Sequence, residues 1–409
     1  MAFQQGLSGL NAASYNLEVI GNNVANANTA GFKSSRAEFS DVYATYWGGA
    51  TLNQTGIGVN VSDIAQMFQQ GNMSVTNNPL DMGVNGAGFF RMSSQGAITY
   101  TRNGQFRVDK DGYFSNSQGD RLTGFPANAA GAILQSSSPV DLRVSTMDLS
   151  PQSTTTAAIT SNFDSRKPPL PAAGFNFPDP LNYHNTPTLQ LFDSLGNPHN
   201  LSVYFLKTAP NSWEVYGESD GAPLNGSAAL GTVNFTSAGT IDTAATTLPF
   251  SLSIPVTTGA VSPQPIALDF TGATQFGSSF GVTQIAQDGY ASGRLLGFAI
   301  TNDGIIQGRY SNGQTLSQGQ IVLASFMNQQ GLQPIGNSGW AETSESGQPI
   351  VGTPNQGSRG VISSGSLEES NVDLTAELVN MITAQRASQA SAQTIKTQAQ
   401  LMQTLVNPR

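Results

Sequence analysis

Residues 371–406 read NVDLTAELVNMITAQRASQASAQTIKTQAQLMQTLV and contain neither Pro nor Gly. Mostly apolar and small residues recur there in alternating steps of four and three, the spacing that keeps one side of an α-helix facing one partner. The pattern predicts a single helix of roughly 54 Å at 1.5 Å per residue, which is too long to be buried inside a small domain. We expect Ser366 or Ser370 to cap its first turn. Three acidic residues, Glu368, Glu369 and Asp373, are expected near the positive end of its dipole. The repeating positions are Leu374, Leu378, Met381, Gln385, Ser388, Ala392, Ile395, Ala399, Met402 and Val406.

The start of the chain carries the same spacing, at Phe3, Leu7, Leu10, Ser14, Leu17, Gly21 and Val24. Gly6, Gly9 and Gly21 lower helix stability, so we expect this helix to become ordered mainly through packing. Two such segments predict two helices that pack on each other and on neighbouring copies of the chain. Two ordinary amphipathic helices at the edge of one globular domain would show the same periodicity. The candidate assembly interface consists of Phe3, Leu7, Leu10, Leu17, Val24, Leu374, Leu378, Met381, Ile382, Ala392, Ile395, Met402 and Val406.

The composition excludes several classes of protein. With 409 residues, the chain is long enough for two or three domains. The 26 acidic residues outnumber the 17 basic ones, which argues against nucleic acid and anionic membranes as partners. The absence of Cys excludes disulfides, thiol catalysis and Cys-ligated metals. Only 11% of residues are charged, and a surface of amides and hydroxyls suits subunit contacts because such groups lose less on desolvation; an ordinary secreted protein could share this composition.

We expect neither a membrane span nor a secretory leader in this sequence. It has no run of 18 apolar residues, so we expect no membrane insertion. Its first residues lack a basic region and an uninterrupted apolar core. If the protein leaves the cell, we expect it to use a route that does not cleave such a signal.

Between the terminal segments the pattern changes to short strands joined by turns. Asn-Gly and Asp-Gly pairs between apolar and aromatic runs are hairpin signals. They occur over residues 72–145 and again over 287–362, which we assign to one discontinuous middle β-domain. Residues 146–286 contain 14 of the 21 prolines and both histidines, and we predict that they form an inserted outer β-domain. The remaining predicted parts are the inner helical domain, 1–24 and 371–409, and the connecting segments, 25–71 and 363–370.

Few side chains form a pattern that suggests catalysis or metal binding. Asp109 and Asp111 lack the remaining ligands of a calcium loop and are interpreted as turn residues. His184 and His199 have no third ligand in sequence and are interpreted as surface histidines rather than a metal site. No Ser/His/Asp arrangement or close pair of carboxylates is apparent. We therefore expect no enzyme activity, no catalytic residues, no cofactor and no metal.

Residues 22–33 read NNVANANTAGFK, in which Asn and Gly suit a helix exit followed by a turn. This string resembles the N-terminal signature of the axial proteins of the bacterial flagellum, a family of rod, hook and hook-associated proteins. Residues 365–374, GSLEESNVDL, resemble the C-terminal signature of the hook proteins in that family. The sequence departs from the family pattern near Ser388, where many relatives carry an aromatic residue. The signature positions are Asn23, Asn26, Asn28, Thr29, Gly31, Phe32, Lys33, Asn371, Val372 and Asp373.

The resemblance implies a mainly β, multidomain structural subunit. Its terminal helices would form a coiled-coil-like inner domain lining a channel, with the discontinuous β-domain as the middle tube and the insert outside. Such subunits would polymerise into a curved hollow tube at the cell exterior. The tube would act as a universal joint that passes motor torque from rod to filament and as an export channel.

The resemblance also implies partners. The chain would bind copies of itself, the hook cap protein, the distal rod protein, the hook–filament junction protein and the flagellar type III export apparatus, through which it would leave the cell. The alternative is the distal rod protein, a straight drive shaft that shares the terminal segments but lacks a large insert. A secreted enzyme is not supported, because the sequence has no Cys and no pattern of catalytic residues. An adhesin built of β-domains could share the composition but would not need matched terminal repeats.

Overall fold

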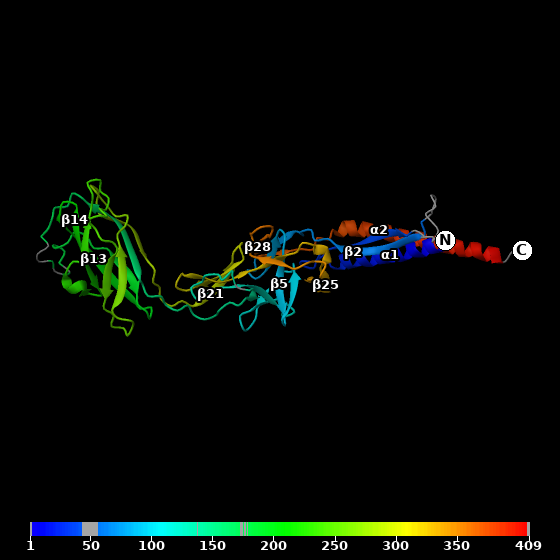
Figure 1. Ribbon diagram of the computed structural model, residues 1–409, viewed down its shortest axis with the longest axis horizontal. Coiled ribbons are helices and arrows are strands. Elements are labelled where there is room, and N and C mark those ends of the chain that lie inside the picture. Colours follow the sequence, from blue (N-terminus) through cyan, green and yellow to red (C-terminus); the bar gives the residue numbers. More distant parts are fainter. Residues whose placement is uncertain are drawn as a thin grey trace. The chain divides into compact units, whose positions relative to one another are not determined.

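The structure is a computed structural model that describes residues 2–42, 56–136, 138–171, 175, 177 and 179–406 of the chain. The expected fold class is confirmed: strands dominate, and the first and last elements of the chain are α-helices (Figure 1). The side chain of Val406 and residues 43–55 of a predicted connecting segment lie outside the described part. The chain divides into two compact units. We call Met1–Thr146, Gly297–Arg309 and Thr315–Arg409 the helical–β unit, and Met147–Leu296 with Tyr310–Gln314 the insert unit.

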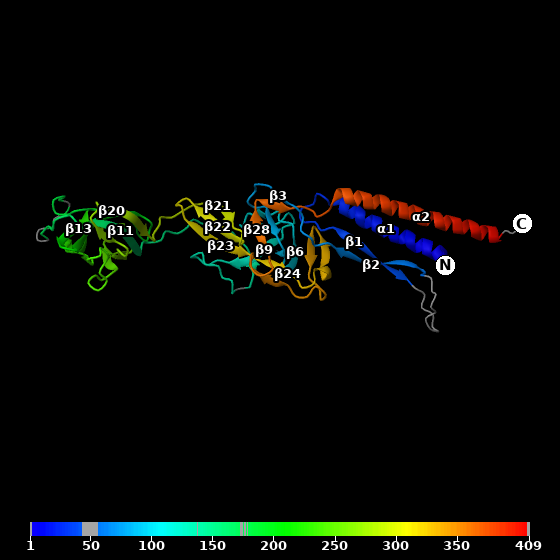
Figure 2. The same cartoon turned by 90° about the horizontal axis from the view of Figure 1, so that it is seen from above.

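Both predicted terminal helices are present. The first, α1, covers Ala2–Ala25, and the second, α2, covers Leu374–Val406. They run antiparallel, because Gly6 lies against Ile395 near one end and Asn23 hydrogen-bonds to Glu377 near the other. The last turns of α2 continue past the start of α1 (Figure 2).

The helix α2 is capped by a residue other than the predicted ones. The Asp373 carboxylate accepts hydrogen bonds from the backbone N–H groups of Thr375 and Ala376, at 2.9 and 3.2 Å. A cap must immediately precede the helix, which starts at Leu374. The predicted cap from Ser366 or Ser370 is therefore wrong, because both lie too far upstream.

An antiparallel hairpin lies beside the helices. It consists of β1, Ser35–Val42, and β2, Gly58–Gln66, and α1 lies between this hairpin and α2 (Figure 2). Sequence analysis assigned this stretch to a connecting segment. The strands were not recognised because β1 buries only Ala37 and so lacks the alternation of a half-buried strand.

A large sheet forms the β-part of the helical–β unit, with the path β21-β22-β23-β9-β5-β6-β26-β25. Its core contains interlocked aromatic rings, among them Phe89, Tyr100, Phe326 and Trp340. Small two-stranded ladders join β3 to β29 and β4 to β28. The strands are β3 Met73–Val75, β4 Met82–Asn85, β5 Phe89–Ser94, β6 Ala97–Thr101, β7 Arg107–Val108, β8 Phe114–Ser115, β9 Arg121–Pro126, β10 Val140–Asp141, β21 Leu295–Ile300, β22 Ile305–Tyr310, β23 Thr315–Ile321, β24 Leu323–Ser325, β25 Gln333–Gly336, β26 Gly339–Ala341, β27 Ile350–Gly352, β28 Val361–Ser364 and β29 Ser366–Glu368.

The insert unit packs one sheet against another. Alternate residues of β11 point into a core shared with β13 and β14, where Phe163 lies 5.0 Å from the Trp213 ring. The buried Trp213 indole donates to Gln275 at 2.7 Å, so its one polar atom is satisfied. The strands are β11 Thr156–Asp164, β17 Phe250–Ile254, β18 Gln264–Asp269, β19 Thr274–Phe276 and β20 Gly281–Gln287 in one sheet, and β12 Thr188–Phe192, β13 Pro198–Ala209, β14 Ser212–Ser219, β15 Ala222–Pro223 and β16 Gly231–Asn234 in the other.

The histidines of the insert unit differ from the prediction. His184 is half-buried, with Nε2 2.9 Å from the Pro168 carbonyl oxygen. The interpretation of His199 as a surface residue is wrong, because its ring is buried between the carboxylates of Asp193 and Asp220. By contrast, Asp109 caps a turn, accepting hydrogen bonds from the N–H groups of Asp111 and Tyr113, as interpreted from the sequence.

Candidate assembly interface

The contact between α1 and α2 is built on small residues. A Cβ atom added to Gly6 would lie 2.9 Å from Cγ1 of Ile395, and one added to Gly9 would lie 3.1 Å from Oγ of Ser391. The glycines that weaken α1 as an isolated helix therefore let the two helices approach closely. Continuing these contacts in steps of three and four gives one set of covered positions on each helix, which we call the intrachain seam. They are Gly6, Gly9, Ala13, Asn16, Ile20 and Asn23 in α1, and Glu377, Met381, Ala384, Ser388, Ser391, Ile395 and Gln398 in α2. Other buried residues of α1, such as Ala12 and Val19, lie outside this set.

The predicted assembly interface lies mainly beside this seam. In α1 the predicted repeat is displaced from the seam by one residue, which is about 100° around the helix. In α2 the predicted repeat and the intrachain seam share Met381, Ser388 and Ile395. Leu10, Leu17 and Val24 are half-buried, and Ala392 is exposed. The other predicted residues with described side chains are the exposed Phe3, Leu7, Leu374, Leu378, Ile382 and Met402.

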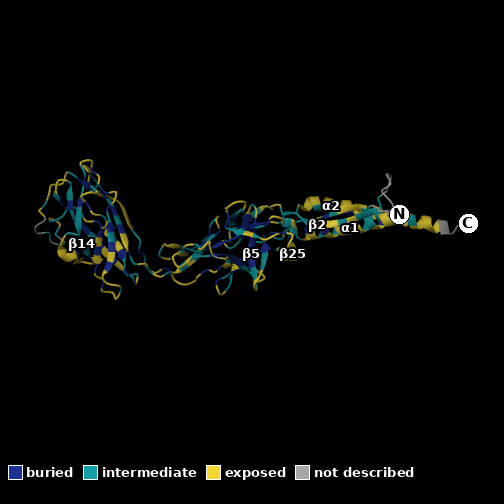
Figure 3. Cartoon of the chain, viewed as in Figure 1, coloured by how far each residue is buried: buried dark blue, intermediate teal, exposed yellow. Residues whose placement is uncertain are grey.

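A set of large apolar side chains on the two helices therefore faces solvent, and much of α2 is coloured as exposed in Figure 3. Sequence analysis did not include Val379 and Leu401, which are also exposed. Burying one such side chain stabilises a complex by about 1.5–3 kcal/mol, so the exposure of these residues favours binding to a further partner. We call them the uncovered apolar residues: Phe3, Leu7, Leu374, Leu378, Val379, Ile382, Leu401 and Met402.

Asn23 and Asn371 hold crossing segments of backbone together. The buried Asn23 amide donates to the Ser35 carbonyl oxygen and to Glu377, and its oxygen accepts from the Ser35 N–H. Asn371 accepts from the N–H of Ser34 at 2.8 Å and donates to the carbonyl oxygen of Met67 at 2.6 Å. These signature residues connect the end of α1, the hairpin and the start of α2.

The other signature residues shape the exit of α1. Thr29 donates to the side chain of Asn26 at 3.2 Å. Gly31 has φ +70°, and a Cβ there would clash with the backbone of Arg102 and Asn103, so this position requires glycine. Asn28 is exposed, whereas Phe32 and Val372 are half-buried. Asp373 caps α2, and Lys33 is buried.

A buried cluster of charges joins both signatures to the β-part of the helical–β unit. The Lys33 ammonium lies 2.6 Å from Oε1 of Glu368, and the Arg102 guanidinium lies 3.0 Å from Oε2. The side chains of Lys33 and Glu368 are fully buried. Two cations share one carboxylate. Lys33 also donates to the carbonyl oxygen of Gln69, and Arg102 donates to those of Val84 and Gly86, whereas the buried Nε of Arg102 has no hydrogen-bond partner among the described residues.

Burial has an electrostatic cost in this cluster. It lowers the pKa of Lys33 from its usual value, although the charge and hydrogen bond of Glu368 oppose the shift. Burial lowers the pKa of Arg102 in the same way. Because burying charges costs free energy even when they are paired, we interpret the cluster as fixing the position of three chain segments rather than adding net stability.

Sequence analysis missed this cluster. It placed Glu368 at the dipole of α2, whereas the residue lies in β29, and it gave no role to Arg102. Ion pairs between residues this distant in sequence leave no local pattern. The available signal was the position of Glu368 inside the C-terminal signature.

The close approach of the helices gives a first prediction. Gly6→Ala should not stabilise α1, because the added Cβ displaces Ile395 and offsets the gain in helix propensity of about 1 kcal/mol. Gly21→Ala is the matched control, since a Cβ there meets nothing within 4 Å and the full gain is expected. Thermal melting followed by circular dichroism compares them. Equal stabilisation by both substitutions would show that the seam is not tightly packed.

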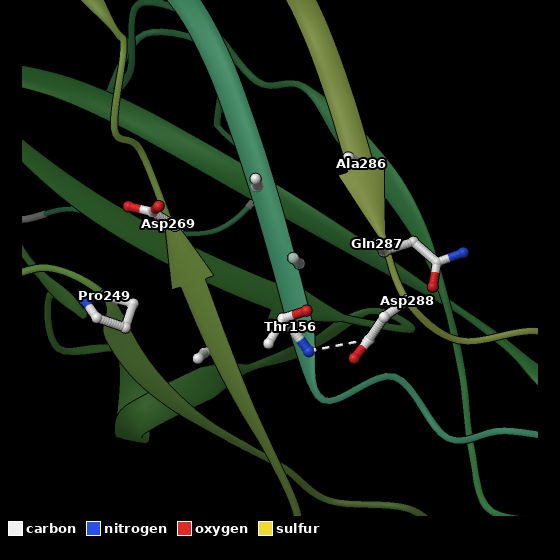
Figure 4. Close-up of a pocket in the computed structure, with 9 residues that line it drawn as sticks. Thr156, Pro249, Asp269, Ala286, Gln287 and Asp288 are labelled. Carbon is white, nitrogen blue, oxygen red and sulfur yellow. Dashed lines mark hydrogen bonds between the residues drawn. The ribbon is translucent and has the colours of Figure 1, made fainter. Parts of the chain in front are cut away.

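The insert unit contains a hollow of about 490 Å³ between β11, β18 and β20 (Figure 4). Ala157, Ala267 and Ala286 contribute to its apolar lining. Asp288 accepts hydrogen bonds from the N–H groups of Thr155 and Thr156, and Asp269 accepts from Thr271. Asp269 therefore caps a local turn, whereas Asp288 joins the end of β20 to the start of β11.

Comparison with known families gives the class of protein. Four family models match: "Flagella basal body rod protein" over residues 3–33, "Flagellar hook protein FlgE/F/G D1 domain" over 83–160, "Flagellar basal body protein FlaE D2 domain" over 162–290, and "Flagellar basal body rod FlgEFG protein C-terminal" over 363–407. Both terminal signatures lie within these matches. The helices, signatures and β-units thus define an axial component of the bacterial flagellum.

Individual relatives narrow this class. The chain is 40% identical to the flagellar hook protein FlgE of Escherichia coli and 41% identical to that of Salmonella typhimurium, each over 100% of both chains. It is 34% identical to the FlgE of Borreliella burgdorferi over 98% of both. The chain therefore belongs to the flagellar hook protein FlgE family and is a structural subunit of the hook. These relatives favour the hook over the distal rod alternative.

A solved structure shares the fold. The Helicobacter pylori flagellar hook protein FlgE2 aligns with a TM-score of 0.54 and 15% identity, covering 72% of this chain and 100% of that one. Within the described residues, no helix is both long and apolar enough to cross a membrane.

Proposed function

We propose that copies of this chain polymerise through α1 and α2 into a curved, hollow tube. The observation that carries this proposal is the set of uncovered apolar residues beside the intrachain seam. Within the chain, α1 packs on both α2 and the hairpin, and α2 packs on α1, so the uncovered apolar residues are left for neighbouring copies. The helices would line a channel that serves export.

The rest of the chain would form the outer layers of the tube. We propose residues 72–145 and 287–362 as its middle layer, with 146–286 outside and 25–71 and 363–370 as connections. Low-charge contacts between these layers would permit several packings of nearly equal free energy, so that curvature travels around the tube as it rotates. The tube would thus act as a universal joint that transmits torque from rod to filament.

The proposed partners follow from the place of the tube between rod and filament. The first and last subunits of the tube would contact the distal rod protein and the hook–filament junction protein, and assembly would proceed under the hook cap protein. Export through the flagellar type III apparatus, without cleavage of a signal peptide, would place the subunits outside the cell. The structural role requires no catalytic residue, cofactor or metal.

The shape of the polymer tests the proposal. Purified full-length protein should form curved or supercoiled tubes on salt-induced polymerisation, as seen by negative-stain microscopy. Straight tubes would favour a rod-like shaft instead. Persistent monomers that also fail to extend isolated hook fragments would contradict assembly through the helices.

Removal of the insert unit should spare tube formation but change its curvature. Leu149 and Gly293 exchange backbone hydrogen bonds of 2.7 and 3.1 Å, so residues 150–292 can be replaced by a two-residue hairpin turn. Because α1, α2 and the charge cluster remain, microscopy should show tubes of altered bend beside curved tubes of the full-length control. Loss of all assembly by a folded deletion variant would contradict this prediction.

A further inference from the structure

Three turns of the insert unit meet around His199. Its Nδ1 lies 2.6 Å from Oδ2 of Asp220, and its Nε2 lies 3.3 Å from Oδ2 of Asp193. A neutral imidazole donates from only one ring nitrogen. Both hydrogen bonds can therefore exist together only when the ring carries two protons and a positive charge.

The carboxylate of Asp193 depends on this cation. Its side chain is fully buried and also accepts hydrogen bonds from the Thr258 hydroxyl at 2.6 Å and from the N–H groups of Leu195 and Asn197. Asp193 belongs to the turn between β12 and β13, Asp220 to the turn between β14 and β15, and Thr258 to the loop between β17 and β18. Loss of the ring charge would leave a buried carboxylate without its cation, which costs free energy.

The turn of Asp193–Asn197 packs against the segments that lead into and out of the insert unit. A Cβ added to Gly196 would lie 2.8 Å from Cβ of Pro151 and 3.3 Å from the backbone nitrogen of Ser292. Residues 149–152 pair with 290–293 in an antiparallel ladder. The Asp193–Asn197 turn thus packs against both connecting segments of its own unit.

We propose that His199 is a pH-dependent lock that holds these turns on the connecting segments while its ring is doubly protonated and releases them when it loses a proton. Deprotonation would loosen residues 149–152 and 290–293 without unfolding either sheet. A consequence for the flexibility of the hook rests on the proposed function above, whereas the lock itself is a property of the single chain.

The direction of the pH dependence follows from the ionisable groups. Burial opposes a charge on the ring, but hydrogen bonds and charges of Asp220 and Asp193 outweigh it and raise the pKa of His199 above 6.5. Although burial opposes their ionisation, hydrogen bonds lower the pKa values of Asp193 and Asp220, with Thr258 and Asn197 contributing for Asp193 and the N–H of Asn200 for Asp220.

A raised histidine pKa gives stabilisation that is complete below pH 6.5 and is lost as the pH rises through the folded-state value. The lowered carboxylate pKa values give stabilisation that is lost in acid. The lock therefore holds from mildly acidic pH up to the folded-state pKa of His199. Within the described residues, Asp193 and Asp220 are the ionisable groups that face the ring.

The chain contains only two histidines, which permits a direct test. Unpolymerised full-length protein with labelled histidines is titrated by NMR, and hydrogen exchange over 147–154 and 288–294 is measured between pH 6 and 9 and corrected for intrinsic rates. We expect His199 to titrate above pH 6.5 and protection of these segments to fall tenfold or more through that titration. The step should persist in His184→Gln, the matched control, and disappear in His199→Gln.

Two results would overturn the proposal: a His199 that titrates at or below pH 6.5, or a step that persists in His199→Gln. If that variant does not fold, Asp220→Asn replaces it. Because Asp220 is partly exposed, its replacement should leave the fold intact while lowering the His199 pKa and moving the exchange step to lower pH. An unmoved step would also overturn the proposal. None of these outcomes depends on polymerisation, so they are distinguishable from a failure of the proposed function.

Discussion

Glu368→Gln is expected to destabilise the helical–β unit by about 3–5 kcal/mol, the usual result of removing one partner from a buried ion pair. The substitution keeps the shape of the side chain but leaves the charges of Lys33 and Arg102 without a buried counter-charge. Since Lys33 follows α1 and Glu368 precedes α2, the positions of both helices on the β-part should be loosened together.

Hydrogen exchange can measure this effect locally. Amides of β4 and β28 should lose protection a hundredfold or more, whereas those of the insert unit serve as an internal reference. Glu369→Gln is the matched control, because the neighbouring carboxylate is exposed and its neutralisation should change protection little. If Glu368→Gln and Glu369→Gln behave alike, the cluster does not hold these segments.

The combined substitution Leu378→Glu and Ile382→Glu is expected to abolish polymerisation while leaving the monomer folded. These side chains are 50% and 51% exposed in the single chain, so charges are tolerated there. In the proposed tube they would be buried against neighbouring helices, where each unpaired carboxylate would cost several kcal/mol. Sedimentation after salt-induced polymerisation measures assembly, and circular dichroism checks the monomer.

The control for this experiment lies on the same helix. Asn380 is exposed and is two residues from both Leu378 and Ile382, and so points to the opposite side of α2. Asn380→Glu should therefore sediment like the unmodified protein. Normal polymerisation of the double variant would place the subunit contact elsewhere and contradict the role given to the uncovered apolar residues.

Elements with local patterns could be predicted closely from the sequence. The helix expected over 371–406 begins only three residues later, because the absence of Pro and Gly and the regular spacing are properties of the segment itself. The turn interpreted at Asp109 is present for the same reason, because its carboxylate accepts hydrogen bonds from the nearby N–H groups of Asp111 and Tyr113.

Features that depend on distant contacts could not be predicted. The spacing of α1 does not reveal which of two adjacent sides meets α2, so the predicted repeat lies one residue from the intrachain seam. Glycines interpreted as weakening α1 also provide close packing, which becomes evident only when Ile395 is placed beside Gly6. Similarly, nothing near His199 in sequence indicates that Asp220 lies across the ring.

The central claim is that the terminal helices hold the hook together through the side chains they leave uncovered. A helical reconstruction of the polymer by electron cryomicroscopy tests this most directly. It should show α1 and α2 lining the channel, with Leu7, Leu378 and Ile382 buried against helices of neighbouring subunits. A tube in which these side chains remain exposed, and in which only β-units touch, would contradict the claim.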